Sequence, residues 1–169
     1  NFVVDPNTVR RIARLAEVGD ADHVVEIGAG LGSLTLALAD TGAAVTAVEV
    51  DRHLLPVLRD VVADRDVTVV AGDALALDWS EVLAASDRWT LVANLPYNVA
   101  TPLVLDLLDG VPAIRRMLVM VQREAGERLA ADVGDPDRPP PRELPAGRPP
   151  VRGSTPTHRA QVAGGRHRP

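Results

Sequence analysis

Along the first 133 residues, short runs of β-branched and aliphatic residues alternate with segments in which apolar residues recur at helical spacing. The runs predict five strands, at residues 23–27, 44–50, 67–71, 89–93 and 117–121. The helical spacing predicts a first helix that starts at Asp5-Pro6, where a capping residue precedes proline. Further helices are predicted at residues 31–39, 51–63 (capped by Asp51), 80–85, 101–108 and 123–131.

The order of these elements predicts the fold class. Strands that consist of continuous apolar runs and alternate with helices are typical of a parallel sheet that is covered on both faces. We therefore expect an α/β protein with a doubly wound, mostly parallel, Rossmann-like sheet.

This pattern stops near Gly134. Residues 134–169 contain nine of the 14 prolines and seven of the arginines, and they show no periodicity. Such a segment buries too little apolar surface to offset its ordering entropy, so we predict that it is disordered. A solvated linker is favoured over a basic tail that binds nucleic acid. The predicted organisation is one folded domain over residues 1–133 and an Arg/Pro-rich tail over residues 134–169.

Composition narrows the class of protein. The chain has 169 residues and no cysteine, which excludes a disulfide scaffold, a thiolate metal site and a cysteine nucleophile. No apolar run approaches the roughly 18 residues that a membrane span needs, so we expect a cytoplasmic protein with no membrane partner. All 18 basic residues are arginine, yet residues 1–133 carry a net charge of −9. That balance leaves little visible surface for binding RNA phosphates.

Two candidate ligand-binding features follow the first two predicted strands. The first is the segment Glu26-Ile27-Gly28-Ala29-Gly30-Leu31-Gly32, which ends the first strand and opens a helix, and its glycines let the backbone approach a ligand closely. A tight turn that binds no ligand remains the alternative, because the spacing is not that of the dinucleotide fingerprint. Glu49 ends the second strand, where a carboxylate can accept hydrogen bonds from both hydroxyls of a ribose.

Two more features follow the third and fourth predicted strands. Asp73 comes directly after the third, where its carboxylate can accept from an adenine amine or can simply form a turn. The sequence Asn94-Leu95-Pro96-Tyr97 follows the fourth strand. It offers an amide, a stiff loop with carbonyl groups, and an aromatic ring that can stack on a flipped base. The alternative is a proline-containing turn with Tyr97 packed as a lid on the core.

Together these motifs resemble those of the adenine-N6 methyltransferases that use S-adenosylmethionine. More narrowly, several segments resemble the ribosomal RNA adenine dimethyltransferases, and among them the enzymes that act on small-subunit RNA. These segments are Asn1-Phe2-Val3-Val4-Asp5-Pro6, Asn94–Asn98, Met120–Glu124 and Glu127–Leu129.

The resemblance implies a role for each matching position. The cofactor would be S-adenosylmethionine, with Asn1 and the backbone at Val3 along its methionine end and Gly28 and Gly30 beneath it. Its ribose would bind Glu49, and its adenine would bind Asp73 and Ala74. The target amine would be held by Asn94 and the backbone near Leu95 and Pro96, with Tyr97 stacked on the target base. The resemblance also implies a monomer that acts on the small ribosomal subunit without a metal ion.

Other functions stay open on the sequence alone. One is a large-subunit RNA methyltransferase that confers antibiotic resistance, and another is a fragment that binds cofactor without catalysis. A nucleotide-binding oxidoreductase is disfavoured by the glycine spacing. The family continues with two more strands and a small helical domain, and nothing in residues 134–169 resembles them. We therefore expect a C-terminally truncated chain or a tail that is out of frame, with the fifth strand as an exposed edge.

Overall fold

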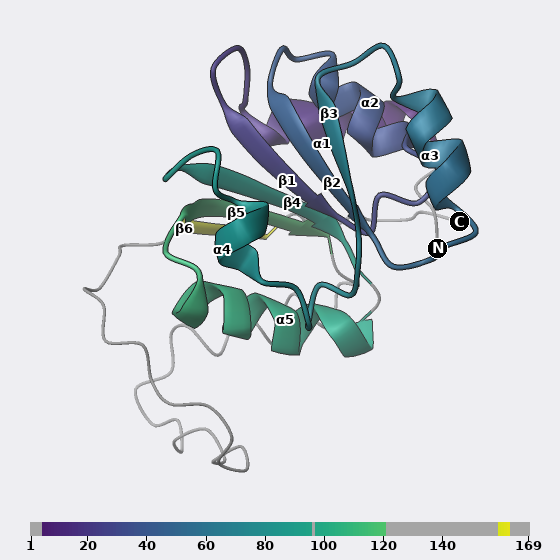
Figure 1. Cartoon of the computed structure of the whole chain (residues 1–169). Helices are drawn as coiled ribbons and strands as arrows, with labels where there is room; N and C mark the ends of the chain where they lie inside the picture. Colours follow the sequence, from purple (N-terminus) through teal and green to yellow (C-terminus); the bar gives the residue numbers. More distant parts are fainter. Residues whose placement is uncertain (1–4, 96, 121–158, 163–169) are drawn as a thin grey trace, which may run out of the picture.

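The computed structural model describes residues 5–95, 97–120 and 159–162. Figure 1 shows a twisted sheet with helices on both sides. The strands are β1 (His23–Ile27), β2 (Ala44–Glu49), β3 (Val67–Ala71), β4 (Trp89–Asn94), β5 (Ile114–Met120) and β6 (Arg159–Val162). The helices are α1 (Pro6–Ala16), α2 (Ser33–Ala39), α3 (Leu55–Val61), α4 (Trp79–Val82) and α5 (Tyr97–Gly110).

The sheet is parallel throughout, with the strand order β3-β2-β1-β4-β5-β6. The order reverses between β1 and β4, which pair from His23↔Trp89 to Ile27↔Ala93. Ligands of open α/β sheets bind at the carboxyl ends of the strands beside such a reversal. The predicted doubly wound parallel sheet is therefore confirmed, and its reversal lies beside the glycine-rich turn and the segment after β4.

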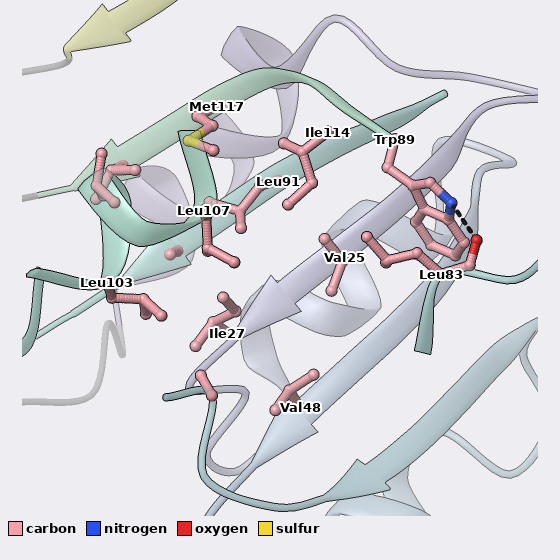
Figure 2. Packing of buried hydrophobic residues seen from close by; sticks show 14 residues of the cluster. Val25, Ile27, Val48, Leu83, Trp89, Leu91, Leu103, Leu107, Ile114 and Met117 are labelled. Carbon is pink, nitrogen blue, oxygen red and sulfur yellow. Dashed lines mark hydrogen bonds between the residues drawn. The ribbon is translucent and has the colours of Figure 1, made fainter. Parts of the chain in front are cut away.

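Alternate residues of the central strands pack into separate cores on the two faces of the sheet. Val24 and Val92 pack against α1 and α2, while Leu58 of α3 anchors a smaller cluster beside them. Val25 and Leu91 point to the opposite face, where α4 and α5 cover them. Figure 2 shows this second cluster and the hydrogen bond of 3.1 Å from the Trp89 indole to the Leu83 carbonyl oxygen.

Helix α1 begins as the sequence predicts. The Asp5 carboxylate accepts hydrogen bonds from the backbone N–H groups of Asn7 and Thr8, and Pro6 is the first helical residue. The predicted cap at Asp51 is wrong, because α3 begins at Leu55 and follows Leu54. Asp51 instead accepts from the backbone N–H of His53, in a turn that precedes the helix.

Helix α5 differs from its predicted start at residue 101. It begins at Tyr97 and contains Pro102 in its interior. Proline is favoured as the first helical residue, which predicts a start at Thr101-Pro102, but the helix starts earlier and continues through Pro102. Tyr97 is therefore a helix-start residue, and its predicted position on a loop is wrong.

The edge of the sheet also differs from the prediction. Arg159–Val162 was expected to lie in a disordered tail, and it forms β6, which pairs with β5 from Arg116↔Arg159 to Val119↔Val162. The unpaired N–H and C=O groups of an edge strand favour the addition of another strand. A four-residue strand has too few positions to show a periodicity, so the sequence pattern could not predict it. The predicted helix at residues 123–131 lies outside the described residues.

Candidate cofactor site

The turn after β1 brings the glycine-rich segment close to the end of β4. Gly28 has a φ of +80° and is exposed, and an added Cβ atom there would lie 3.6 Å from the Asn94 carbonyl oxygen. The same Cβ would lie 3.8 Å from Cδ2 of Leu95. The two segments that the sequence singled out therefore meet at one corner of the sheet, as the pairing of β1 with β4 requires.

Glu49 ties this turn to the end of β2. Its side chain is buried, and its Oε2 atom accepts a hydrogen bond of 2.7 Å from the backbone N–H of Gly30. Its Oε1 atom accepts one of 2.8 Å from the backbone N–H of Asp51. A carboxylate has about four lone-pair positions, so these two bonds leave capacity for further donors.

A second buried carboxylate lies beneath the same turn, at Glu26. Thr35 of α2 donates a hydrogen bond of 2.5 Å to its Oε2 atom. Burial, the largest influence, raises the pKa of Glu26 to about 7; the Thr35 hydrogen bond lowers it and the negative charge of Glu49 raises it. Glu26 opens the glycine-rich segment that the sequence singles out, but its own carboxyl group has no predicted role; the signal for one is an acidic residue inside an apolar strand.

Asp73 lies at the end of β3, close to β2. The backbone N–H of Gly72 donates to the Glu49 carbonyl oxygen at 3.0 Å, which joins the two strand ends. Asp73 is exposed, and its Oδ1 atom accepts from the backbone N–H of Leu75. The turn role that the sequence left open for Asp73 is thus present. Ala74 beside it is buried.

Two exposed apolar side chains flank these carboxylates and were not predicted. Val50 follows Glu49 and is 65% exposed, and Leu75 lies two residues after Asp73 and is 52% exposed. An open groove of about 530 Å³ is lined by Val50, Gly72 and Asp73 together with residues of the α3 region. Apolar side chains beside hydrogen-bonding groups are typical of sites that bind a planar ring with polar edges.

The remaining predicted site residues are described only in part. Asn94 ends β4, and its side chain and that of Leu95 are partly buried. Asn1, Val3 and Pro96 lie outside the described residues, as does the side chain of Tyr97. Among the described residues, no group of three or more histidine, cysteine, aspartate or glutamate side chains could hold a metal ion. No helix in that part of the chain is both long and apolar enough to span a bilayer.

The sheet order and the turn after β1 define the fold of the Rossmann-like methyltransferases. Two solved structures share it with TM-scores of 0.68: the 23S rRNA methyltransferase ErmE, at 30% identity, and a dimethyladenosine transferase from Plasmodium falciparum, at 26%. The similarity to the first structure covers 79% of this chain and 53% of that structure. The similarity to the second covers 80% of this chain and 48% of that structure. The chain belongs to the ribosomal RNA adenine dimethylase family, whose model matches residues 1–139.

Curated relatives are more similar in sequence. Ribosomal RNA small subunit methyltransferase A from Bifidobacterium longum subsp. infantis is 53% identical over 142 residues, which cover 79% of this chain and 46% of the relative. The protein of the same name from Corynebacterium glutamicum is 49% identical over 140 residues, which cover 79% of this chain and 47% of the relative. The chain thus spans about half the length of the curated relatives that it matches.

Proposed function

We propose that this chain carries the cofactor-binding and catalytic part of an enzyme that uses S-adenosylmethionine to dimethylate adenine N6 in small-subunit ribosomal RNA. The observation that carries the proposal is the approach of Gly28 to the Asn94 carbonyl oxygen and the Leu95 side chain. A cofactor over the glycine-rich turn and an adenine held by the segment after β4 would then share one corner of the sheet.

The residues at the strand ends fit an adenosine group. Glu49 keeps acceptor capacity for ribose hydroxyls beyond its bonds to the Gly30 and Asp51 amides. Asp73 with Ala74 is proposed to bind the adenine edge, and the exposed Val50 and Leu75 side chains offer apolar contact to its faces. Asn1 and Val3 are proposed to contact the methionine end of the cofactor.

S-adenosylmethionine, when bound, supplies a methyl group on a positively charged sulfonium. The target nitrogen is a poor nucleophile because its lone pair is delocalised into the purine ring. We propose that Asn94 and the backbone carbonyls near Leu95 and Pro96 accept hydrogen bonds from the amine, which favours a more tetrahedral nitrogen. Tyr97 is proposed to stack on the base. Such positioning is worth up to roughly 7–11 kcal/mol of the barrier.

The small subunit is favoured as the substrate by the relatives. Proteins named for small-subunit methylation are 49–53% identical to the chain, whereas the 23S rRNA methyltransferase is 30% identical. We further propose that the protein acts in the cytoplasm as a monomer.

The test is transfer of labelled methyl groups from S-adenosylmethionine to unmodified small and large ribosomal subunits. We expect transfer to the small subunit. Transfer to the large subunit alone would support the resistance-type function, and binding of S-adenosylhomocysteine without any transfer would support a fragment that lacks catalysis.

The Asn94→Ala variant tests the role of the amide. We expect it to lower transfer about 100-fold or more, as the loss of one positioned polar group does in other enzymes, while S-adenosylhomocysteine still binds. The matched control is Asn7→Ala, on the exposed surface of α1, which should leave transfer unchanged. Loss of binding together with transfer in Asn94→Ala would contradict the assigned role.

A further inference from the structure

Two buried carboxyl groups lie at the carboxyl ends of adjacent strands, beneath the glycine-rich turn. Glu26 of β1 is 2% exposed and Glu49 of β2 is 6% exposed. The strands pair at Glu26↔Ala47 and Ile27↔Val48, and the charge of Glu49 acts on the titration of Glu26. Glu49 is bonded to the turn itself through Gly30. The proposed function uses Glu49 and leaves Glu26 without a role.

The elements packed around Glu26 supply no compensating cation. Helix α2 and strand β4 carry no charged side chain within their bounds, and Glu49 is the one charged residue of β2. His23 lies at the opposite end of β1. Asp40 after α2 is exposed, as are Arg59 and Asp60 of α3. Helix α1 carries three arginines, all of them exposed: Arg10, Arg11 and Arg14. In the described part of the chain, neither carboxylate takes part in an ion pair.

The ionisation of a buried carboxyl group is sensitive to any charge placed near it. A buried carboxyl group that faces a second negative charge and no cation holds its proton to higher pH than an exposed one. Burial therefore raises the pKa of Glu26 to about 7, within the physiological range. A cation placed beside the turn would stabilise the ionised form, and by linkage the ionised form would stabilise the bound cation.

We propose that Glu26 is a specificity-determining residue that makes the glycine-rich turn prefer a positively charged cofactor over its neutral product, and that cofactor binding releases the Glu26 proton. The inference rests on the proposed function, in which the cofactor carries a sulfonium charge and the product S-adenosylhomocysteine does not. Methyl transfer would then remove the charge that holds Glu26 ionised, so that uptake of a proton accompanies weaker binding of the product.

The test is isothermal titration calorimetry of the whole chain with each ligand. Titrations run from pH 6 to pH 8, in pairs of buffers that differ in ionisation enthalpy, so that the number of protons released is measured directly. For the wild-type protein we expect proton release with S-adenosylmethionine near pH 7, and an affinity that rises up to tenfold over this range. We expect little release and little pH dependence with S-adenosylhomocysteine.

Two variants isolate the role of Glu26. Glu26→Gln keeps an acceptor for the Thr35 hydroxyl, and we expect it to bind both ligands without proton release and with a smaller ratio of the two affinities. Thr35→Val removes a hydrogen bond that lowers the pKa of Glu26, so proton release should move to higher pH. The matched control is Glu81→Gln, at an exposed glutamate of α4, which should behave as wild type.

The outcomes separate the two proposals. Equal proton release in wild type and Glu26→Gln, or equal release with both ligands, would overturn the role of Glu26 while leaving the cofactor site in place. Absence of binding by either ligand would overturn the proposed function, and the inference with it.

Discussion

Among single residues, Gly28 and Gly32 hold the turn after β1 for different reasons. Both have positive φ, at +80° and +85°, a region that costs an L-residue about 1–2 kcal/mol. A Cβ at Gly28 would meet its neighbours only at ordinary contact distance. A Cβ at Gly32 would lie 3.0 Å from Cδ1 of Leu58 and 3.2 Å from Cγ1 of Val61, so these side chains of α3 would have to shift by a few tenths of an ångström.

The two alanine substitutions should therefore separate stability from ligand binding. We expect Gly32→Ala to lower the free energy of unfolding by about 3 kcal/mol, because overpacking adds to strain. Gly28→Ala should cost only about 1–2 kcal/mol yet weaken S-adenosylhomocysteine binding tenfold or more, because its methyl group would point into the proposed cofactor site. Denaturant unfolding and calorimetry measure the two effects. A greater loss of binding in Gly32→Ala, at concentrations where both variants are folded, would contradict this placement.

The sequence predicted some properties of individual site residues and missed others. Glu49 was identified because it ends an apolar strand 19 residues after Gly30, and the structure confirms that both lie at one turn. The bonds from Gly30 and Asp51 to its two oxygens could not be predicted, because they depend on how the turn folds back over β2. The hydrogen bond from Thr35 to Glu26 could not be predicted for the same reason, since Thr35 approaches Glu26 only once α2 packs on the sheet. The ligand contacts of all these residues stay predictions.

The strands show what a sequence pattern can predict about whole elements, and α5 shows where it fails. Strands β1 and β3 have the predicted bounds, because each is a short run rich in β-branched residues with turn residues at both ends. Helix α5 begins four residues before its predicted start at residue 101 and holds Pro102 in its interior, where the rule for a helix start places no proline. The predicted domain boundary at residue 134 stays a prediction.

The face of α5 that covers the sheet can be tested with two leucines on the same helix. Leu107 is 2% exposed and packs in the core with Leu91 and Met117, whereas Leu105 is 44% exposed. Figure 2 shows Leu107 directed into this cluster. We expect Leu107→Ala to lower the free energy of unfolding by about 2–5 kcal/mol and the control Leu105→Ala to change it by less than about 0.5 kcal/mol, both measured in urea. Equal effects would show that the helix is rotated from this position.

For the whole molecule, the buried carboxyl of Glu26 links global stability to pH in a direction opposite to that of most carboxylates. Its pKa is about 7 in the folded protein and about 4.3 in an unfolded chain, so between these values the folded state binds more protons. Stability is then highest below pH 4 to 5, as far as Glu26 is concerned, and falls as the pH rises to 7. The fall amounts to about 3 kcal/mol, on the scale of 1.36 kcal/mol for each unit of pKa difference.

The Glu26→Gln variant should remove this dependence, because glutamine does not titrate. Relative to wild type, its free energy of unfolding should increase by about 3 kcal/mol between pH 4.5 and pH 7.5, measured by urea unfolding of the unliganded chain. Other titrating groups contribute equally to both proteins and cancel in the difference. For the matched variant Glu81→Gln, at an exposed residue, the free energy of unfolding relative to wild type should not change over the same pH range. A flat difference for Glu26→Gln as well would mean that Glu26 is ionised in the folded protein at low pH, which would remove the physical basis for coupling proton release to the charge of the cofactor.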